Sequence, residues 1–426
     1  MGNCTTILEL YESMTKKDIA RELYRKVREQ QLDDFRDRMP DDKQGVEFEI
    51  NGKKYVAAIR RLTPTECNRL QGVPEWYNWE DISETQCYKM LGNGWQCETI
   101  KHCWSFLPDF GRPIRVWSLF DGMSCASIVL KGLGIPVEVL VSSEIDKYAL
   151  QAEKQNFPNM VQVGSVTDIN VPDLVEKYGV PDFICGGSPC QSFSFSGKMK
   201  GMATKQGEEI YTLDKYLSLK EQGFQFEGQS YLFWEFMRIL TELRKYNPNI
   251  YFFLENVEML DKWERVLSHA IGVRGVHINS ALVSAQQRKR IYWSNIRVKD
   301  LGATSMFEEL NDNPFELPRY QTDIPQPEDR GIVINDILQE AADGKYYLKD
   351  NVVSSLMDKT DKGKLKDYLL EPQVTVQEAL GYMSTHDEYS SLSDEEKREI
   401  ATLGYQLEKQ RLHDDYYGAD RNLFED

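Results

Sequence analysis

The feature that most constrains the fold is an alternation of short apolar runs with longer helical patterns between residues 114 and 298. The runs are rich in Val, Ile, Leu and Phe, and each is followed by glycine, serine or an acidic residue. They occupy residues 116–120, 137–141, 161–163, 183–185 and 251–254. Such alternation is typical of βαβ units and predicts an α/β fold with a doubly wound, mostly parallel sheet. Two later runs, 280–283 and 290–294, predict a closing hairpin.

Patterns on either side of this core predict further elements. Residues 15–38 carry an apolar stripe at helical spacing, so we expect an amphipathic helix there. Residues 46–60 alternate apolar and polar side chains around Asn51-Gly52, which is a strong hairpin signal. Near the end of the chain, Ser393 followed by Glu396 predicts the capped start of an acidic helix.

Two helices are expected between the hairpin and the alternating core. Thr63-Pro64 followed by Glu66 predicts a helix that begins with a capping box. Residues 83–95 then lead into a helix that runs to Leu107. In this interpretation Gly92-Asn93-Gly94 is a loop in front of that helix, where free backbone N–H groups could meet a ligand.

Composition excludes several classes of protein. The net charge of −17 argues against a protein that coats nucleic acid non-specifically, although a local basic face can still bind DNA. No apolar run reaches the roughly 20 residues of a membrane span, so no membrane partner is expected. The eight cysteines include no C-x-x-C pair, which is typical of a reducing compartment. We therefore expect a cytoplasmic protein, in a bacterial or phage-infected cell.

The stretch from residue 183 to 194 carries the first chemical signal. An apolar run enters Gly186-Gly187, and Ser188-Pro189-Cys190 follows directly. In open α/β sheets the chemistry lies at the carboxyl ends of the strands, which is where Cys190 would be held. A thiol there can act as a nucleophile if its surroundings lower its pKa. The alternative is a buried cysteine with a purely structural role.

The first βα turn and the strand after it suggest a nucleoside cofactor. Asp121-Gly122 follows the first run, and Glu144 ends the next run about 20 positions later. A glycine lets a ligand approach the backbone, and a carboxylate at this spacing can accept hydrogen bonds from ribose hydroxyls. The dinucleotide pattern G-x-G-x-x-G is absent. A cofactor with adenosine but no pyrophosphate fits better, and S-adenosylmethionine is such a cofactor.

Two more motifs fall at the same predicted sheet edge. Glu255 follows an apolar run in Leu254-Glu255-Asn256-Val257, and could serve in proton transfer or cap the next helix. Arg288 and Arg290 are two positions apart, so both would point to one side of a strand. They could bind a phosphate or a base carbonyl and stabilise a thiolate, or form a solvated strand edge.

Taken together, these motifs resemble those of the DNA cytosine-5 methyltransferases. The resemblance is carried by the Phe120-Asp121-Gly122, Gly187–Gln191, Leu254–Val257 and Gln286–Arg290 motifs, in that order. The Arg61–Gly72 and Gly92-Asn93 segments resemble the family's two closing motifs, but here they come first. The motif order is therefore expected to be circularly permuted, which is physically cheap when termini lie close together. The resemblance covers roughly residues 55–300.

The resemblance implies the class I methyltransferase fold and a role for each matching residue. Cys190 would attack C6 of cytosine, Glu255 would hold N3 and the exocyclic amine, Arg290 would contact O2, and Arg288 would steady the nucleophile's loop. The target cytosine would have to be flipped out of the duplex. The residues that would contact S-adenosylmethionine are Phe120, Asp121, Gly122, Met123, Glu144, Ile145, Ser165, Val166, Pro189, Leu232, Asn93 and Gly94.

The chain departs from the family pattern in three places. Ser165 stands where the family usually has an aspartate that contacts adenine, and Asp168 follows three positions later. The glycine-rich first turn is reduced to Gly122. The family's Gly-Asn-Ser-Val is replaced by Gly92-Asn93-Gly94-Trp95. These changes concern the affinity for the cofactor more than the reacting groups.

The permutation also determines the expected domains. We expect a helix and hairpin over residues 1–58, closing methyltransferase motifs over 59–110, the catalytic core over 111–298, and a region with an acidic helical tail over 299–426. The first and last of these would together recognise the target. The insertion at 198–228 is either a mobile lid or a solvated loop.

The expected partner is double-stranded DNA, and the expected state is a monomer, with a cognate restriction endonuclease as a further partner. Three alternatives stay open. The chain could methylate RNA on the same scaffold, it could be a catalytically silent DNA-binding homologue, or it could transfer a group bulkier than methyl.

Overall fold

The computed structural model describes residues 16–50, 53–189, 202–302, 313–339, 342–350, 374 and 376–417. The chain divides into two compact units, Thr63–Glu340 and a second unit made of Met1–Leu62 with Ala341–Asp426. No helix within these described ranges is both long enough and apolar enough to cross a membrane.

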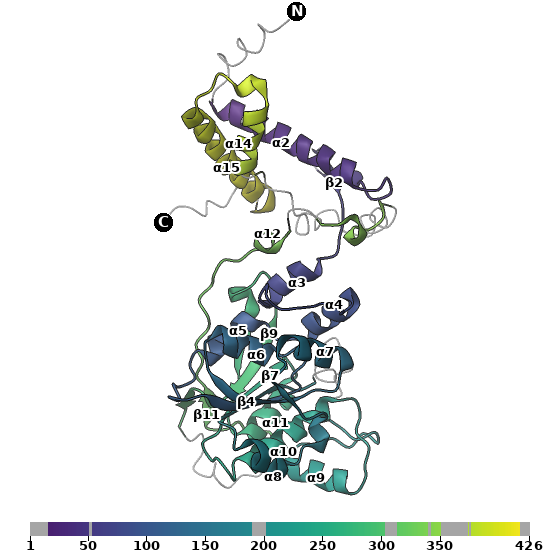
Figure 1. Ribbon diagram of the computed structural model, residues 1–426, viewed down its shortest axis with the longest axis vertical. Helices are drawn as coiled ribbons and strands as arrows, with labels where there is room; N and C mark the ends of the chain where they lie inside the picture. The colour runs from purple at the N-terminus through teal and green to yellow at the C-terminus, as the bar shows by residue number, and fades with distance from the viewer. Residues whose placement is uncertain are drawn as a thin grey trace, which may run out of the picture. The chain divides into compact units, whose positions relative to one another are not determined.

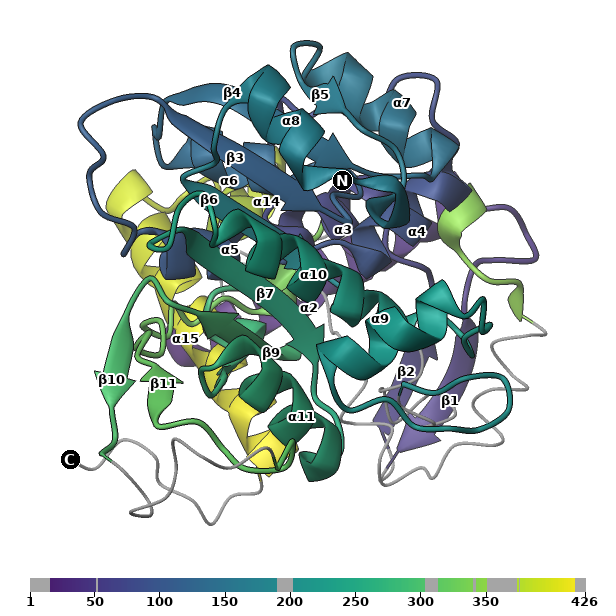
Figure 2. The same ribbon diagram turned by 90° about the horizontal axis from the view of Figure 1, so that it is seen from below.

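The larger unit is built on a seven-stranded sheet with the order β5-β4-β3-β6-β7-β9-β8 (Figure 1, Figure 2). Its strands are β3 (Ile114–Leu119), β4 (Val137–Ser143), β5 (Val161–Gln162), β6 (Phe183–Gly187), β7 (Tyr251–Val257), β8 (Val276–Asn279) and β9 (Lys289–Ser294). The first five strands of that order are parallel, and β9 runs antiparallel to both of its neighbours. The predicted doubly wound, mostly parallel sheet is confirmed.

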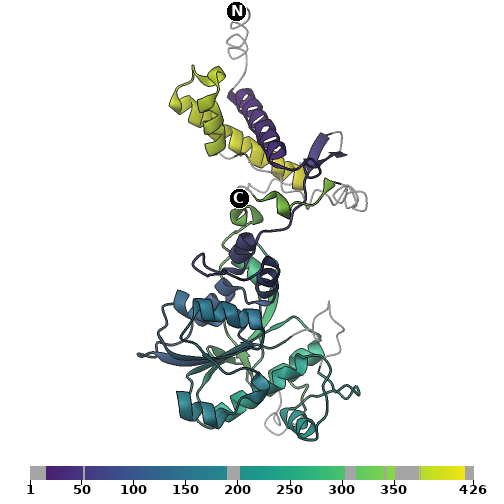
Figure 3. The ribbon, with the colours of Figure 1, turned by 45° about the vertical axis from the view of Figure 1, so that its right-hand side comes forward.

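Helices cover both faces of this sheet (Figure 3). One face packs against α8 (Val171–Tyr178), α9 (Leu213–Glu221), α10 (Phe233–Leu243) and α11 (Asp261–Ile271). The other face packs against α4 (Glu84–Asn93), α5 (Cys97–Trp104), α6 (Cys125–Gly132) and α7 (Lys147–Asn156). Successive strand residues point to opposite faces, so Val116 and Trp117 of β3 enter different cores. Burial on both sides explains why the strands are continuous apolar runs.

Two expected elements differ in the structure. Residues 280–283 were predicted as a strand, but Ser280–Leu282 is a 3-10 turn, η3, and the strand is β8, just before it. The Asn279 side chain explains the difference, because its Oδ1 accepts hydrogen bonds from the backbone N–H groups of Ala281 (3.1 Å) and Arg288 (3.0 Å). Such a side-chain bond favours a turn over a continuing strand.

The helix expected to run to Leu107 is present as α5, which ends at Trp104, and the residues that lead into it form a separate helix, α4. Gly94 has extended backbone angles, and the Gln96 side chain caps α5 by accepting a hydrogen bond from Thr99 N at 2.6 Å. Gly92 and Asn93 are therefore the last turn of α4 and not a loop in front of a helix. A glycine-containing break followed by a capping side chain starts a new helix direction.

Other sequence predictions are confirmed. Helix α3 (Pro64–Gln71) begins with the expected capping box between Thr63 and Glu66, and it ends at Gly72, whose φ is +65°. A left-handed residue at this position favours glycine. The remaining elements of the unit are α12 (Ile334–Ile337), β10 (Val298–Asp300), β11 (Tyr320–Thr322), η1 (Val166–Asp168) and η2 (Ser230–Leu232).

The described part of the insertion, from residue 202 onward, packs into the core. Met202 and Ile210 are fully buried, and α9 lies against α10. The buried Glu235 carboxylate of α10 accepts hydrogen bonds from Tyr216 Oη and Lys220 Nζ of α9. These contacts attach α9 to the core of the larger unit.

The second unit has its own apolar core, formed mainly by α2 (Lys16–Arg38), α14 (Val376–Thr385) and α15 (Asp394–Tyr417). It also contains β1 (Val46–Ile50), β2 (Lys53–Ala57), η5 (Gly344–Tyr346) and η7 (Asp387–Tyr389). The expected first helix and hairpin strands are confirmed, while Asn51 and Gly52 lie outside the described residues. The capping pair at α15 is also present, with Ser393 N donating to Glu396 Oε2 at 2.9 Å.

Candidate active site

The strand register brings the candidate site residues to one edge of the sheet. Leu119 at the end of β3 is level with Ser143 of β4 and with Gly186 of β6. Gly187 is level with Glu255 of β7. Because these strands are parallel, the turns that follow them and the Glu255 side chain lie at the same carboxyl edge, where open α/β sheets bind ligands.

The turn after β3 has an unusual backbone. Phe120, Gly122 and Ser124 all have left-handed φ angles, of +57°, +60° and +65°. Two of them carry side chains, and such positions cost about 1–3 kcal/mol each unless the surroundings impose them. Tyr77 supports the turn by donating from its Oη to the carbonyl oxygen of the buried Met123 at 2.7 Å. A Cβ placed on Gly122 would meet no atom within 4 Å, so the space in front of this residue is open.

Glu144 connects this turn to the end of β4. Its Oε2 accepts a hydrogen bond from Gly122 N at 2.8 Å, and its Oε1 accepts from the backbone N–H groups of Ile145 and Asp146, both at 2.7 Å. The Ile145 side chain is 69% exposed beside this carboxylate. The edge therefore presents an acceptor group next to an exposed apolar side chain.

Asp121 points away from the open space. Its side chain is buried and accepts hydrogen bonds from serine hydroxyls of β3, of the turn and of β4. Its predicted contact with the cofactor stays a prediction, and in the structure these three serine hydroxyls hold its carboxylate. Asp121 N also donates to Ser143 O at 3.2 Å, which ties the turn to β4.

The other predicted cofactor residues follow β5 and β6. Ser165 caps η1 and hydrogen-bonds the Thr167 hydroxyl at 2.7 Å, while the Val166 side chain is buried. Asp168, considered as a substitute for the family's aspartate, is exposed and accepts from that same threonine hydroxyl at 3.0 Å. Pro189 lies two residues after the end of β6.

Leu232 ends η2 and directly precedes α10. Because α10 leads into the parallel strand β7, the amino end of this helix lies at the carboxyl edge of the sheet. Leu232 is therefore at the expected edge.

Glu255, Arg290 and Trp95 surround the end of β6. Arg290 Nε lies 2.9 Å from Glu255 Oε1, and both side chains are mostly buried. A Cβ placed on Gly187 would be 2.7 Å from Trp95 Nε1 and 3.1 Å from Glu255 Oε2. The absence of a side chain at Gly187 is thus what allows the indole and the carboxylate to approach each other.

Arg288 fastens the connection between α4 and α5. Its Nη2 donates to Gly94 O at 2.7 Å and its Nη1 donates to Gly92 O at 3.3 Å. Burial, followed by the positive charge of Arg290, lowers the pKa of the Arg288 guanidinium. The predicted contact of Arg288 with the nucleophile's loop involves Cys190, which lies outside the described residues.

One further residue was missed by the sequence reasoning. The buried Asn256 donates from Nδ2 to Ser188 Oγ at 3.0 Å and to Ser188 O at 3.3 Å. It thereby holds the backbone two residues before Cys190. Asn256 follows Glu255 in one of the motifs described above, but the sequence contained no signal for its partner Ser188, which lies just after β6.

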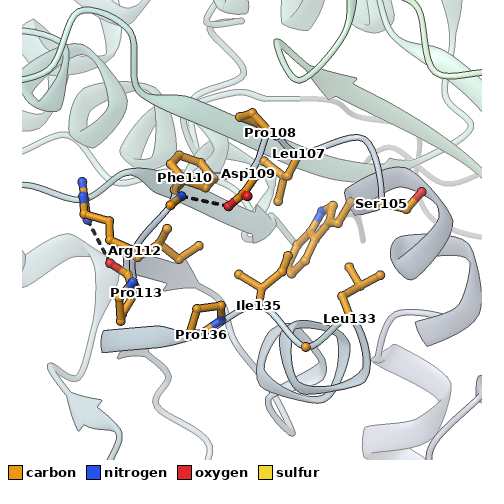
Figure 4. Close-up of a pocket in the computed structure, with 14 residues that line it drawn as sticks. Ser105, Leu107, Pro108, Asp109, Phe110, Arg112, Pro113, Leu133, Ile135 and Pro136 are labelled. Atoms are coloured by element: carbon orange, nitrogen blue, oxygen red, sulfur yellow. Dashed lines mark hydrogen bonds between the residues drawn. The ribbon is translucent and has the colours of Figure 1, made fainter.

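A cavity of about 580 Å³ lies at the opposite edge of the sheet (Figure 4). It is formed around the start of β3 at Ile114 and the end of α6 at Leu133, with the loop at Asp109 beside it. The Asp109 carboxylate is used within this loop, accepting from Gly111 N at 2.8 Å. The cavity is therefore separate from the candidate site. No group of three or more metal-ligating side chains occurs in the part of the chain that the structure describes.

Comparison with known proteins identifies the family. The model of the C-5 cytosine-specific DNA methylase family matches residues 3–104 and 114–417. The chain belongs to this family. It is 27% identical over 292 residues to the orphan methyltransferase M.Rho11sI of Bacillus phage rho11s, covering 62% of this chain and 51% of that protein.

Two further relatives from this family illustrate its range. The type II methyltransferase M.NlaX of Neisseria lactamica is 25% identical over 239 residues, which cover 56% of this chain and 64% of that protein. The DNA (cytosine-5)-methyltransferase DRM2 of Arabidopsis thaliana is 29% identical over 194 residues, covering 43% and 28%. The chain spans about half the length of the phage relatives that it matches.

Proposed function

We propose that this chain is an S-adenosylmethionine-dependent DNA cytosine-5 methyltransferase that works through a covalent bond between Cys190 and its target base. The observation that carries the proposal is the arrangement around the end of β6. Glu255 is level with Gly187 and paired with Arg290 at 2.9 Å, at the same edge as Gly122 and Glu144. Family membership supports the same reaction.

The residues present fit the cofactor. When bound, S-adenosylmethionine supplies an electrophilic methyl group on a sulfonium. The open space in front of Gly122 allows a ligand to approach the backbone, and the adjacent Glu144 carboxylate can accept hydrogen bonds from ribose hydroxyls. The exposed Ile145 side chain offers an apolar surface for the adenine ring. Phe120, Met123 and the other residues predicted to contact S-adenosylmethionine would form the rest of this site.

The protein's own residues account for the chemistry on the base. The Cys190 thiolate forms a bond to C6 of cytosine, which makes C5 nucleophilic, while Glu255 holds N3 and the exocyclic amine. Arg290 keeps the Glu255 carboxylate in place and faces the base carbonyl O2. After methylation, C5 loses its proton and the bond between Cys190 and C6 breaks. These atoms are inaccessible in a stacked duplex, so the base must be flipped out at a cost of a few kcal/mol.

The test is transfer of a labelled methyl group to mixed-sequence duplex DNA. Wild type is expected to label cytosine C5, Cys190→Ala is expected to label nothing, and Cys67→Ala on α3 serves as the matched control. A duplex containing 5-fluorocytosine is expected to trap wild type covalently, because the C5 fluorine cannot be lost. Labelling of structured RNA but not DNA, or no labelling at all with cofactor binding intact, would contradict the proposal.

We further propose that residues 1–58 and 299–426 recognise the target sequence and that the motif order is circularly permuted. The closing segments are joined to the end of the core, as Ser284 Oγ and Gln286 Nε2 both donate to Leu70 O, at 2.6 and 3.0 Å. Hydrogen-exchange protection of α2 on binding of a methylatable duplex would support the first part. A chain reopened before β3, with residues 16–110 joined after 417, should keep cofactor binding if the second part is right.

The proposal also includes a monomer that protects DNA from a cognate restriction endonuclease. M.NlaX is named a type II methyltransferase, which favours a nuclease partner. M.Rho11sI is named an orphan methyltransferase, which favours an enzyme without a nuclease partner. Light scattering of the purified protein tests the first point. Cleavage of DNA from a producing host with a panel of nucleases tests the second.

A further inference from the structure

A buried pair of acidic side chains lies behind the two turns of the cofactor site. Asp121 follows β3 and is 7% exposed, and Glu153 lies on α7 and is 1% exposed. Neither carboxyl group faces the open edge, and the proposed reaction uses neither of them. Two acids buried together without a nearby cation would repel each other strongly if both were ionised. The arrangement therefore needs an explanation.

Counting hydroxyl hydrogens shows where a proton must lie. The Ser142 hydroxyl is within hydrogen-bonding distance of Asp121 Oδ2 (3.1 Å) and Glu153 Oε1 (2.9 Å), and it already accepts from Gln162 Nε2 at 2.9 Å. A hydroxyl has only one hydrogen to donate. It can satisfy one carboxylate, so the other carboxyl group must carry its own proton.

Glu153 is the better holder of that proton. Asp121 also accepts hydrogen bonds from the Ser118 and Ser124 hydroxyls, and such donors favour the ionised form. Glu153 has a second oxygen, Oε2, that is buried and receives no donor from the described residues. A neutral carboxyl group tolerates such an unpaired oxygen better than a carboxylate does, and a hydrogen on Glu153 Oε1 can be donated to the Ser142 hydroxyl, which then donates its own hydrogen to Asp121. Burial, and then the charge of Asp121, raise the pKa of Glu153 to about 10.

This pair connects the two turns that the proposed function assigns to the cofactor. Asp121 is part of the left-handed turn, and its hydrogen bonds reach Ser118 on β3 and Ser142 on β4. Glu153 lies on α7, which begins directly after the Glu144 turn. The hydrogen bonds from Glu153 through Ser142 to Asp121 therefore support the contact between Gly122 and Glu144 from behind.

We propose that Glu153, as a neutral acid, is a positioning residue for the cofactor site. It donates its proton into the hydrogen-bond network that Asp121 forms with its serine partners, and it thereby holds the turn after β3 against the end of β4. The inference rests on the proposed function, since it assigns these two turns to S-adenosylmethionine. Loss of the proton to solvent leaves two adjacent carboxylates, which push α7 and the turn apart. The other titratable groups that face the pair among the described residues are all acids, namely Glu144, Tyr77 and Cys185. None of them supplies a compensating positive charge.

The test measures binding of S-adenosylhomocysteine by calorimetry between pH 7.5 and pH 10. Glu153→Gln keeps a donor but cannot ionise, Glu153→Ala removes the donor, and Glu176→Gln at an exposed position of α8 is the matched control. We expect Glu153→Gln to bind within about threefold of wild type at pH 7.5 and Glu153→Ala about tenfold more weakly. S-adenosylhomocysteine itself gains or loses protons over this pH range, which affects its binding to every variant equally. The readout is therefore the ratio of the variant's affinity to the wild-type affinity at each pH.

That ratio is expected to rise with pH for Glu153→Gln and to stay constant for Glu176→Gln. Wild type and Glu176→Gln should lose affinity together toward pH 10, and Glu153→Gln should lose at least about threefold less. Equal pH profiles for wild type and Glu153→Gln, or full affinity in Glu153→Ala, would overturn the inference while leaving the proposed function intact. Absence of binding by wild type at pH 7.5 would instead overturn the proposed function, and the inference with it.

Discussion

Replacing Gly187 by alanine adds one methyl group at the point where Trp95 and Glu255 meet. The added Cβ would lie 2.7 Å from Trp95 Nε1 and 3.1 Å from Glu255 Oε2. Carbon contacts become favourable only from about 3.5 Å, so the indole would have to move by roughly 0.8 Å. Gly187 does not have a left-handed φ, which means that the backbone itself tolerates alanine. The effect of the substitution therefore comes from the methyl group alone.

The expected loss is larger in activity than in stability. Inserting a methyl group into a packed site costs about 1–3 kcal/mol of folding free energy. A displacement near 1 Å at a reacting group can lower the rate about hundredfold. Cofactor affinity should stay within about threefold, because Gly122 and Glu144 are not touched by the added group. Single-turnover methyl transfer, urea unfolding and calorimetry measure these three quantities separately.

The control for this prediction is Gly132→Ala on α6, where the new Cβ would meet only the flexible end of Lys101, at 3.9 Å. Trp95→Phe removes the closest atom, so the double variant with Gly187→Ala should regain part of the lost rate. A double-mutant cycle should show a coupling of about 1–2 kcal/mol between these positions. Full activity in Gly187→Ala, or additive effects in the double variant, would refute the reasoning.

Three further predictions concern stability. Burial raises the pKa of Glu153 to about 10, so the folded protein keeps a proton on this residue that the unfolded chain releases above about pH 4.3. The free energy of unfolding of wild type should therefore fall as the pH rises between these two values, by up to about 1.4 kcal/mol per pH unit. Glu153→Gln cannot ionise and should not show this loss. Urea unfolding at pH 5 and pH 8 measures this, and parallel losses would contradict it. Glu235→Ala leaves Lys220 and Arg238 without their buried carboxylate and should cost about 3 kcal/mol in thermal unfolding, whereas an unchanged Tm would disprove the role of this cluster. Thr63→Ala removes a helix cap and should cost about 1 kcal/mol, with Thr63→Ser restoring it.

Much of the fold could be predicted because its signals are local. The strands β3, β4 and β7, which carry Asp121, Glu144 and Glu255 at or near their carboxyl ends, were recognisable as apolar runs. Parallel strands bring their carboxyl ends to one edge regardless of the loops between them. The capping box of Thr63 and Glu66 needs only four residues of sequence. Where a prediction was wrong, at residues 280–283, a hydrogen bond that the Asn279 side chain accepts from Ala281 N had overridden the apolar pattern.

The sequence by itself therefore determined the fold class, the family and the edge of the sheet where the candidate site lies, because periodicity and motif spacing depend on neighbouring residues. Only the tertiary structure decided which partners these residues take. Arg288 binds the carbonyl groups of the α4–α5 connection almost 200 positions away, and Asp121 turns inward toward Glu153. Trp95 and Glu255 can both lie this close to Gly187, on a third element, only because this residue has no side chain. Such contacts arise from packing between distant segments, and no local pattern in the chain encodes them.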